Sequence, residues 1–197
     1  INLFQQSPQL MHNLLELLCE RVRQGNRVLL DSEQNANIDT LTGTFNRRWL
    51  KHVFDRESTR CTFSKRPLCM LMLDVDHFKA YNDQHGHIAG DYALRQVAQT
   101  LRAQLRPTDS LARYGGEEFV ILLPEMGEDD GRSIGERLRQ GLQQVTSFYS
   151  PLGTLPGVTV SIGLALMQPK DSLQSLIARA DSALYKAKRQ GRNCLSS

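Results

Sequence analysis

Apolar residues fall along the chain in two patterns, and each pattern predicts a different kind of element. Runs rich in apolar and β-branched residues at 68–73, 120–123 and 157–165 predict buried strands. Apolar residues that recur every three or four positions predict helices, which would bury Trp49, Leu50 and Val53; Leu94, Val97, Leu101 and Leu105; Ile134, Leu138, Leu142 and Val145; and Leu176, Ala180, Leu184 and Ala187. One more helix is predicted over 77–85.

These elements follow one another as helix, strand, two helices, hairpin, helix, strand and helix. The hairpin joins a weaker strand at 111–114 to the apolar strand at 120–123. This order is typical of an α/β sandwich of the α+β class. A central, mostly antiparallel sheet would be flanked by helices and would include short extra strands at its edge.

Polar, proline and glycine residues predict where the elements begin and end. Asn46 stands near the start of the first helix of the domain, and Asp91 stands where the N-cap of the helix with Leu94 belongs. Pro107 is expected to end that helix, and Gly191 is expected to end a last helix over 172–190. Residues 149–157 are predicted to be a loop.

Residues 1–37 predict a helix or linker that stands apart from a domain over 38–197. Ser7 and Pro8 form a helix start, and an apolar stripe follows at Met11, Leu14, Leu15, Leu18 and Val22. Self-association is one interpretation of this stripe and packing on the same domain is the other, while Gly25 weakens the case for an unbroken helix. Because the first residue is not Met, we expect a fragment whose upstream regulatory domain is missing.

Composition excludes several classes of protein. The chain has 197 residues and a formal net charge of +3, and its basic residues are interspersed with acids, which argues against nucleic-acid binding. No apolar stretch approaches the roughly 18 residues of a membrane span, so we expect no membrane contact by this fragment. Its 4 cysteines lack metal-ligand spacing, and reduced thiols in a cytoplasmic protein are the simplest interpretation.

The hairpin turn carries an unusual pair of acids. Gly115 and Gly116 are expected to supply the positive-φ freedom of a tight turn, and Glu117 and Glu118 follow them directly. Adjacent carboxylates at a rigid turn are destabilising unless a positive group binds beside them. The turn is therefore the candidate centre of the function.

A second acidic pair ends the strand at 68–73. Asp74 and Asp76 lie on one face of an extended strand, although solvation or a helix cap formed by Asp76 would also explain them. If this strand pairs antiparallel with the one that begins at Glu118, both acidic pairs converge. Two carboxylates about 4 Å apart repel by about 4 kcal/mol at an effective dielectric near 20. Such a cluster favours Mg²⁺ or Mn²⁺, together with substrate phosphates that complete the metal shell.

Lys188 and Arg192 are candidate partners for phosphate charge beyond that metal. Both stand at the end of the last predicted helix. A cationic last turn is also what helix electrostatics alone would favour. The spacing of these two residues leaves both interpretations open.

Four motifs together resemble the GGDEF family of diguanylate cyclases. They are Asp39-x-Leu-Thr-Gly-x-x-Asn-Arg-Arg48, Asp74-Val-Asp-His-Phe-Lys-x-x-Asn82-Asp, Gly86-His-x-x-Gly-Asp91 and Arg113-Tyr-Gly-Gly-Glu-Glu-Phe119. The resemblance runs in order from about Ile38 to Asn193. It implies a fold similar to the palm of nucleotide cyclases and polymerases, of the ferredoxin type. It also implies the condensation of two GTP to cyclic di-GMP with release of two pyrophosphates.

The resemblance also implies a role for individual positions. The metal ligands would be Asp74, the Val75 carbonyl and Glu117, with two Mg²⁺ or Mn²⁺ ions per active site. Asp76 and Glu118 would complete the acidic site, and Glu118 would help to deprotonate the ribose 3′-hydroxyl unless water does so. The substrate contacts would be Phe78, Lys79, Asn82, Asp91, Lys188 and Arg192, of which Asn82 and Asp91 would recognise guanine.

Regulation and assembly are implied as well. Arg106 and Asp109 match the RxxD inhibitory site of the family, which Arg137 would complete; without the resemblance they read as a surface ion pair. Because each protomer holds one GTP, the enzyme would act as a homodimer. The alternative is a catalytically silent receptor for cyclic di-GMP, although the intact acidic turn argues against it.

Overall fold

The computed structural model describes residues 12, 13, 15–21, 23 and 37–197. The chain divides into two compact units, Ile1–Asn37 and Ile38–Ser197. The described residues before 37 are helical, and Leu15 and Leu18 among them are exposed. Other residues of the predicted N-terminal helix lie outside the described residues; they are Ser7, Pro8, Met11, Leu14, Val22 and Gly25.

The second unit is built on a mixed sheet, in which six strands of the described chain take the order β1-β3-β4-β2-β7-β8. Their bounds are Phe45–Asn46 for β1, Leu68–Val75 for β2, Ser110–Arg113 for β3, Glu118–Pro124 for β4, Val160–Leu166 for β7 and Leu195–Ser196 for β8. The four inner strands pair antiparallel, while β1 and β8 join the edges in parallel. The predicted α+β class with short edge strands is confirmed.

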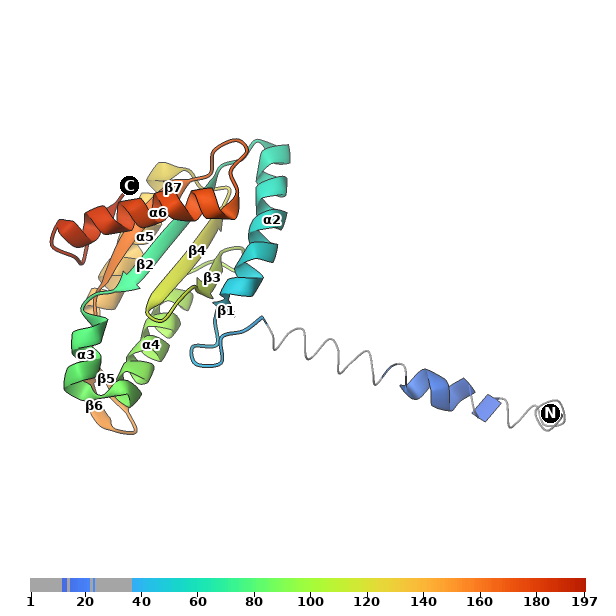
Figure 1. The fold of residues 1–197 in the computed structure, drawn as a ribbon, viewed down its shortest axis with the longest axis horizontal. Helices are drawn as coiled ribbons and strands as arrows, with labels where there is room; N and C mark the ends of the chain where they lie inside the picture. Colours follow the sequence, from blue (N-terminus) through green and yellow to red (C-terminus); the bar gives the residue numbers. More distant parts are fainter. Residues whose placement is uncertain (1–11, 14, 22, 24–36) are drawn as a thin grey trace. The chain divides into compact units, whose positions relative to one another are not determined.

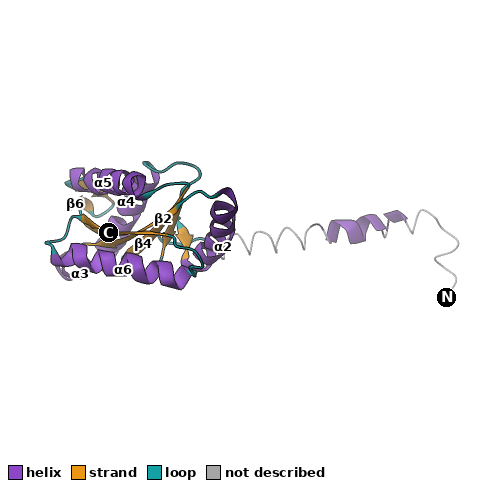
Figure 2. Ribbon diagram, turned by 90° about the horizontal axis from the view of Figure 1, so that it is seen from above, coloured by secondary structure: helices purple, strands orange, loops and turns teal. Residues whose placement is uncertain are grey.

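Helices cover both faces of this sheet (Figures 1 and 2). They are α2 (Arg47–Ser64), α3 (Phe78–His85), α4 (His87–Arg102), α5 (Glu128–Gln144) and α6 (Leu173–Arg189). In Figure 2, α4 and α5 lie on one side of the strands and α6 on the other, and α2 shares an apolar cluster with α6. No helix in the described part of the chain combines the length and the apolarity that crossing a membrane requires.

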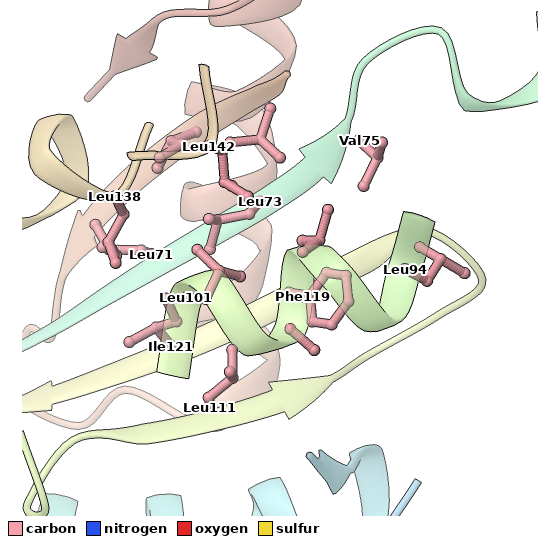
Figure 3. Close-up of a cluster of buried hydrophobic side chains, with 14 of the residues drawn as sticks. Leu71, Leu73, Val75, Leu94, Leu101, Leu111, Phe119, Ile121, Leu138 and Leu142 are labelled. Atoms are coloured by element: carbon pink, nitrogen blue, oxygen red, sulfur yellow. The ribbon is translucent and has the colours of Figure 1, made fainter. Parts of the chain in front are cut away.

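Alternation along the strands divides the apolar side chains between two cores. Leu71, Leu73 and Val75 of β2 face α4 and α5, where they meet Phe119 and Leu101 (Figure 3). The residues between them, Met70 and Met72, face α2 and α6 instead. All eight residues of β2 are buried, which is why this strand reads as a nearly continuous apolar run.

Three local predictions were wrong. Residues expected to form a loop contain a separate hairpin of β5 (Ser147–Ser150) and β6 (Gly153–Pro156). Asp91 is not an N-cap, because α4 begins at His87 and Gly86 precedes it with a φ of 86°. The same helix ends at Arg102, five residues before Pro107, and a turn fills the interval.

Candidate active site

Three carboxylates gather where β2 ends and β4 begins. Asp74 lies directly opposite Glu118 in the antiparallel register of the two strands. The amide of Val75 donates to the Glu117 carbonyl at 3.2 Å, so the turn is bonded to the end of β2. Facing positions of a strand pair hold their Cβ atoms about 5 Å apart. The two acidic segments therefore meet at one end of the sheet.

The electrostatics of this cluster reflect crowding of like charges. Burial, followed by the charge of Asp74, raises the pKa values of both Glu117 and Glu118. Burial also raises the pKa of Asp74, against the lowering effect of the Lys188 ammonium, whose Nζ lies 2.8 Å from Asp74 Oδ2. A further positive group at this site would relieve the repulsion among the three carboxylates.

The end of α6 brings cations to the carboxylates. Ser172 caps the start of α6, and its last turn carries Lys188 inward to Asp74. Arg192 follows in the left-handed region with a φ of 65°, and its charge lowers the pKa of Asp74. Helix electrostatics alone do not account for Lys188, because this residue forms an ion pair with the buried Asp74 carboxylate.

The two glycines of the turn serve a purpose that differs from the predicted one. Neither Gly115 nor Gly116 adopts a positive φ. A Cβ at Gly115 would instead lie 2.6 Å from Glu118 Oε2, whereas one at Gly116 would meet nothing within 4 Å. Gly115 therefore leaves room for the Glu118 carboxylate, and the expected need for backbone freedom was wrong.

Asp76 is occupied by hydrogen bonds from its own chain. Its Oδ1 accepts from Ser161 Oγ at 2.6 Å, and its Oδ2 accepts from Thr159 Oγ1 at 2.7 Å and from the Asn193 amide at 3.0 Å. It does not cap α3, whose N-cap is His77. Asp76 thus ties the loop after α6 to β7, and both of its oxygens are engaged away from the acidic turn.

The α3–α4 pair holds four of the residues predicted to contact substrate. Asn82 of α3 has a buried Oδ1 with no hydrogen-bond partner among the described residues. Its side chain packs against Gly90 of α4. A Cβ atom added to Gly90 would lie 1.8 Å from that oxygen and 3.1 Å from Phe78 Cζ. Asp91 follows Gly90 and is exposed, as is Lys79 on α3, while Phe78 is buried. A buried acceptor without a donor is costly unless a ligand supplies one.

The oxygen donors at the end of β2 fit a magnesium ion. Among the described residues, no group of three or more His, Cys, Asp or Glu side chains is arranged to hold a metal. Asp74, Glu117 and the Val75 carbonyl nevertheless make an all-oxygen set of two carboxylates and one carbonyl. Mg²⁺ is commonly held by one or two carboxylates while substrate phosphates and water complete its shell. The donor set suits that mode and not a closed protein cage.

The RxxD segment lies in the connection between α4 and β3. Arg106 Nη2 bonds to Asp109 Oδ1 at 2.6 Å, and the Asp109 side chain is only 1% exposed. This bond raises the pKa of Arg106 above its already high value. Arg137 reaches the same connection from α5, where its Nη2 donates to the Gln104 carbonyl at 2.9 Å. The three predicted residues are therefore anchored to one short segment.

A family model described as "Diguanylate cyclase, GGDEF domain" matches residues 36–194. The chain belongs to the GGDEF family. The diguanylate cyclase DgcP of Pseudomonas aeruginosa is 40% identical over 167 residues, which are 85% of this chain and 25% of that protein. DosC of Escherichia coli, also named a diguanylate cyclase, is 39% identical over 162 residues, or 82% of this chain and 35% of that protein. This GGDEF chain thus spans about a quarter to a third of these curated relatives.

Solved GGDEF structures have the same fold. The coiled coil and GGDEF domain of DgcB from Caulobacter crescentus, in complex with c-di-GMP, matches with a TM-score of 0.88 and 30% identity over 96% of this chain and 100% of that one. The active GGEEF domain of a diguanylate cyclase from Vibrio cholerae matches with a TM-score of 0.69 and 32% identity over 76% of this chain and 95% of that one. The predicted family is confirmed.

Some functional contacts had no clear signal in the sequence. Thr159 directly precedes β7 and Ser161 lies within it, and nothing in this two-residue spacing indicates Asp76 as the acceptor of both hydroxyls. Gly90 belongs to the Gly86-His-x-x-Gly-Asp91 motif, but the motif does not indicate that the Asn82 side chain packs against it. Both contacts join positions that only the folded chain brings together.

Proposed function

We propose that this GGDEF domain is a diguanylate cyclase that condenses two GTP to cyclic di-GMP and two pyrophosphates. The observation that carries the proposal is the register that sets Asp74 opposite Glu118, with Lys188 bonded to Asp74. Carboxylates and cations lie side by side there, so that carboxylates could hold a metal ion and cations could bind the phosphates of the substrate. The names of the relatives, diguanylate cyclases, support the same reaction.

Guanine recognition is proposed for Asn82 and Asp91. The buried Asn82 Oδ1 needs a hydrogen-bond donor. Guanine offers N–H groups on its pairing edge, including one at ring N1, whereas ring N1 of adenine carries no hydrogen. Phe78 packs beside this amide and Lys79 stands exposed on the same helix, within the substrate part of the site. The α3–α4 pair would thus select GTP over ATP.

Asp74, Glu117 and the Val75 carbonyl would hold Mg²⁺ or Mn²⁺, with two ions as our expectation for each site. The metal supplies Lewis-acid stabilisation of phosphate charge. Lys188 and Arg192 would neutralise the β- and γ-phosphates. Glu118 would accept the proton of a ribose 3′-hydroxyl. The hydroxyl oxygen would then bond to the α-phosphorus of the other GTP, while the bond from that phosphorus to the oxygen that bridges to the β-phosphate breaks and pyrophosphate departs.

We further propose a homodimer. A chain that holds one GTP supplies one nucleophile and one α-phosphate, whereas cyclic di-GMP needs two of each. Two copies related by a two-fold axis would bring the nucleotides face to face. The N-terminal segment of residues 1–37 would help to hold them together. The described residues 15–21 of this segment are helical, and all seven are exposed.

The reaction is assigned to the cytoplasm, where thiols stay reduced. Cys19, Cys61, Cys69 and Cys194 are all free. Incubation of the chain with GTP and Mg²⁺ should yield cyclic di-GMP, detected by chromatography against a standard. A demonstrably dimeric preparation that binds cyclic di-GMP but forms none would contradict the proposal and favour the silent receptor.

Product inhibition at Arg106, Asp109 and Arg137 yields a prediction. Arg106→Ala should raise the concentration of cyclic di-GMP needed for half-inhibition by about tenfold or more, because a guanidinium can bind guanine O6 and N7 together. Initial rates measured with added product test this. Arg132→Ala, on the exposed face of α5, serves as the control. Inhibition equal to that of the wild type would remove the regulatory role.

Gly90 yields a second prediction. Gly90→Ala should raise the KM for GTP by about tenfold with a smaller change in kcat, because the new methyl group displaces the Asn82 amide that meets guanine. Steady-state kinetics separate the two parameters. Ala89→Gly provides a control at the adjacent position. A KM that stays at the wild-type value would show that Asn82 does not depend on this packing.

A further inference from the structure

A groove of about 600 Å³ lies between α2 and α6, beside the catalytic turn. Its cationic side chains are Arg47, Arg48 and Lys51, and Tyr114 and Ile177 line it as well. We call it the α2–α6 groove. Tyr114 is the residue immediately before Gly115, so the groove adjoins the turn that carries Glu117 and Glu118. The two helices pack in one apolar cluster, to which Leu50 of α2 and Leu176 of α6 belong.

The cations of this groove lack acidic partners. Within the described part of the chain, no carboxylate forms an ion pair with Arg47, Arg48 or Lys51. Asp55 is the acid among the lining side chains, so the lining carries an excess of positive charge. Uncompensated cations around a concave surface attract anions.

Arg47 is held in place by the fold. It begins α2 directly after Asn46, whose side chain accepts from the amides of Arg48 and Trp49 and whose backbone pairs with Arg113 of β3. The guanidinium carbon of Arg47 lies 4.6 Å from the centre of the Tyr114 ring. Stacking on an aromatic ring limits the motion of the guanidinium while leaving its N–H groups available.

Arg47 also acts on the catalytic turn. Its charge lowers the pKa of Glu118, against the larger raising effect of burial, which places the guanidinium within electrostatic reach of that carboxylate. Lys188 acts on Glu118 in the same direction from its bond with Asp74. Burial and the charges of Asp74 and Asp181 raise the pKa of Glu118, while both Lys188 and Arg47 lower it.

The order of the strands separates these two cations. In the series β1-β3-β4-β2-β7-β8, Glu118 of β4 lies between β3 and β2. Arg47 follows β1 on one side, whereas Lys188 bonds to β2 and Arg192 precedes β8 on the other. One set of cations would serve the GTP of the same chain. The second set, which forms no ion pair in the described part of the chain, would be available to a different polyanion at the same carboxylate.

We propose that the α2–α6 groove binds the phosphate groups of the second GTP, the one that the other copy of the chain carries to Glu118. This inference rests on the proposed cyclase function and its two-fold dimer. Arg47 would contact the phosphate nearest to Glu118, and Arg48 and Lys51 would contact the phosphates beyond it. Two triphosphates that meet face to face repel each other, and a separate cation set for each removes part of that repulsion.

Arg47→Ala tests the proposal. We expect kcat for cyclic di-GMP to fall by about a hundredfold, as is typical when one preorganised donor to a reacting phosphate or oxyanion is lost. Arg47→Lys should recover part of the loss because it keeps the charge. Arg66→Ala, an exposed arginine just beyond the other end of α2, should turn over like the wild type.

A binding measurement separates the groove from the site at Lys188. At a protein concentration low enough to keep the chain monomeric, Arg47→Ala should bind a non-hydrolysable GTP analogue within about twofold of the wild type. Lys188→Ala should bind it at least about tenfold more weakly. Equal weakening by both substitutions would assign the groove to the chain's own nucleotide and overturn the inference.

The kinetic outcomes are also distinct. Wild-type turnover in Arg47→Ala, with cyclic di-GMP still produced, would overturn the inference and leave the cyclase function standing. Absence of cyclic di-GMP from the wild-type dimer would overturn both. Melting temperatures equal to that of the wild type show that a lost rate is not a lost fold.

Discussion

Glu118→Gln should lower turnover of GTP to cyclic di-GMP by about a thousandfold while the protein stays folded. The amide keeps the shape of the side chain in the space that Gly115 leaves for it. It cannot accept the proton of a ribose hydroxyl. The assay is the initial rate of cyclic di-GMP formation at saturating GTP and Mg²⁺.

Stability provides the internal check on this variant. Burial and the charge of Asp74 raise the pKa of Glu118, which means that the folded protein disfavours its ionised form. A neutral amide removes that repulsion, so the melting temperature should equal or exceed that of the wild type. Glu128→Gln, on the exposed start of α5, should leave the rate unchanged. Wild-type turnover in Glu118→Gln would refute the role of this carboxylate.

Asp76→Ala should lower the free energy of unfolding by about 3 kcal/mol. The substitution leaves the hydroxyls of Ser161 and Thr159 and the amide of Asn193 without their common acceptor. Hydrogen bonds to a charged group contribute more than neutral ones, and Asp76 is only 7% exposed. Chemical denaturation followed by fluorescence or circular dichroism measures the change.

Two further variants define what Asp76 does. Asp76→Asn keeps one acceptor oxygen and should lose about half as much stability. Asp83→Ala, an exposed acid on α3, should unfold with the wild-type midpoint. A wild-type midpoint in Asp76→Ala together with weaker Mn²⁺ binding would instead support the metal role that the sequence pattern indicated for Asp76.

Local signals predicted some elements well and others poorly. The cap at Asn46 and the cap at Ser172 lie where short-range chemistry favours a helix start, and both helices begin there. Asp91 has the same chemistry but lies within α4, because Gly86 with its positive φ turns the chain five residues earlier. The β5–β6 hairpin escaped prediction since its exposed, alternating residues lack an apolar run.

The sequence by itself determined the family, the α+β class and the identity of the residues with chemistry. Motif spacing and apolar periodicity are local properties, and both can be read directly from the amino-acid sequence. Glu117 and Glu118 stood out because adjacent charges at a turn are costly wherever the turn lies.

Only the tertiary structure decided which of those residues meet. Register set Asp74 opposite Glu118, and the return of α6 brought Lys188 to the same carboxylate. The tertiary structure also turned Asp76 toward β7 and placed Arg47 over Tyr114. Such contacts join residues far apart in the chain, and their geometry follows from the packing of whole elements, which no local pattern encodes.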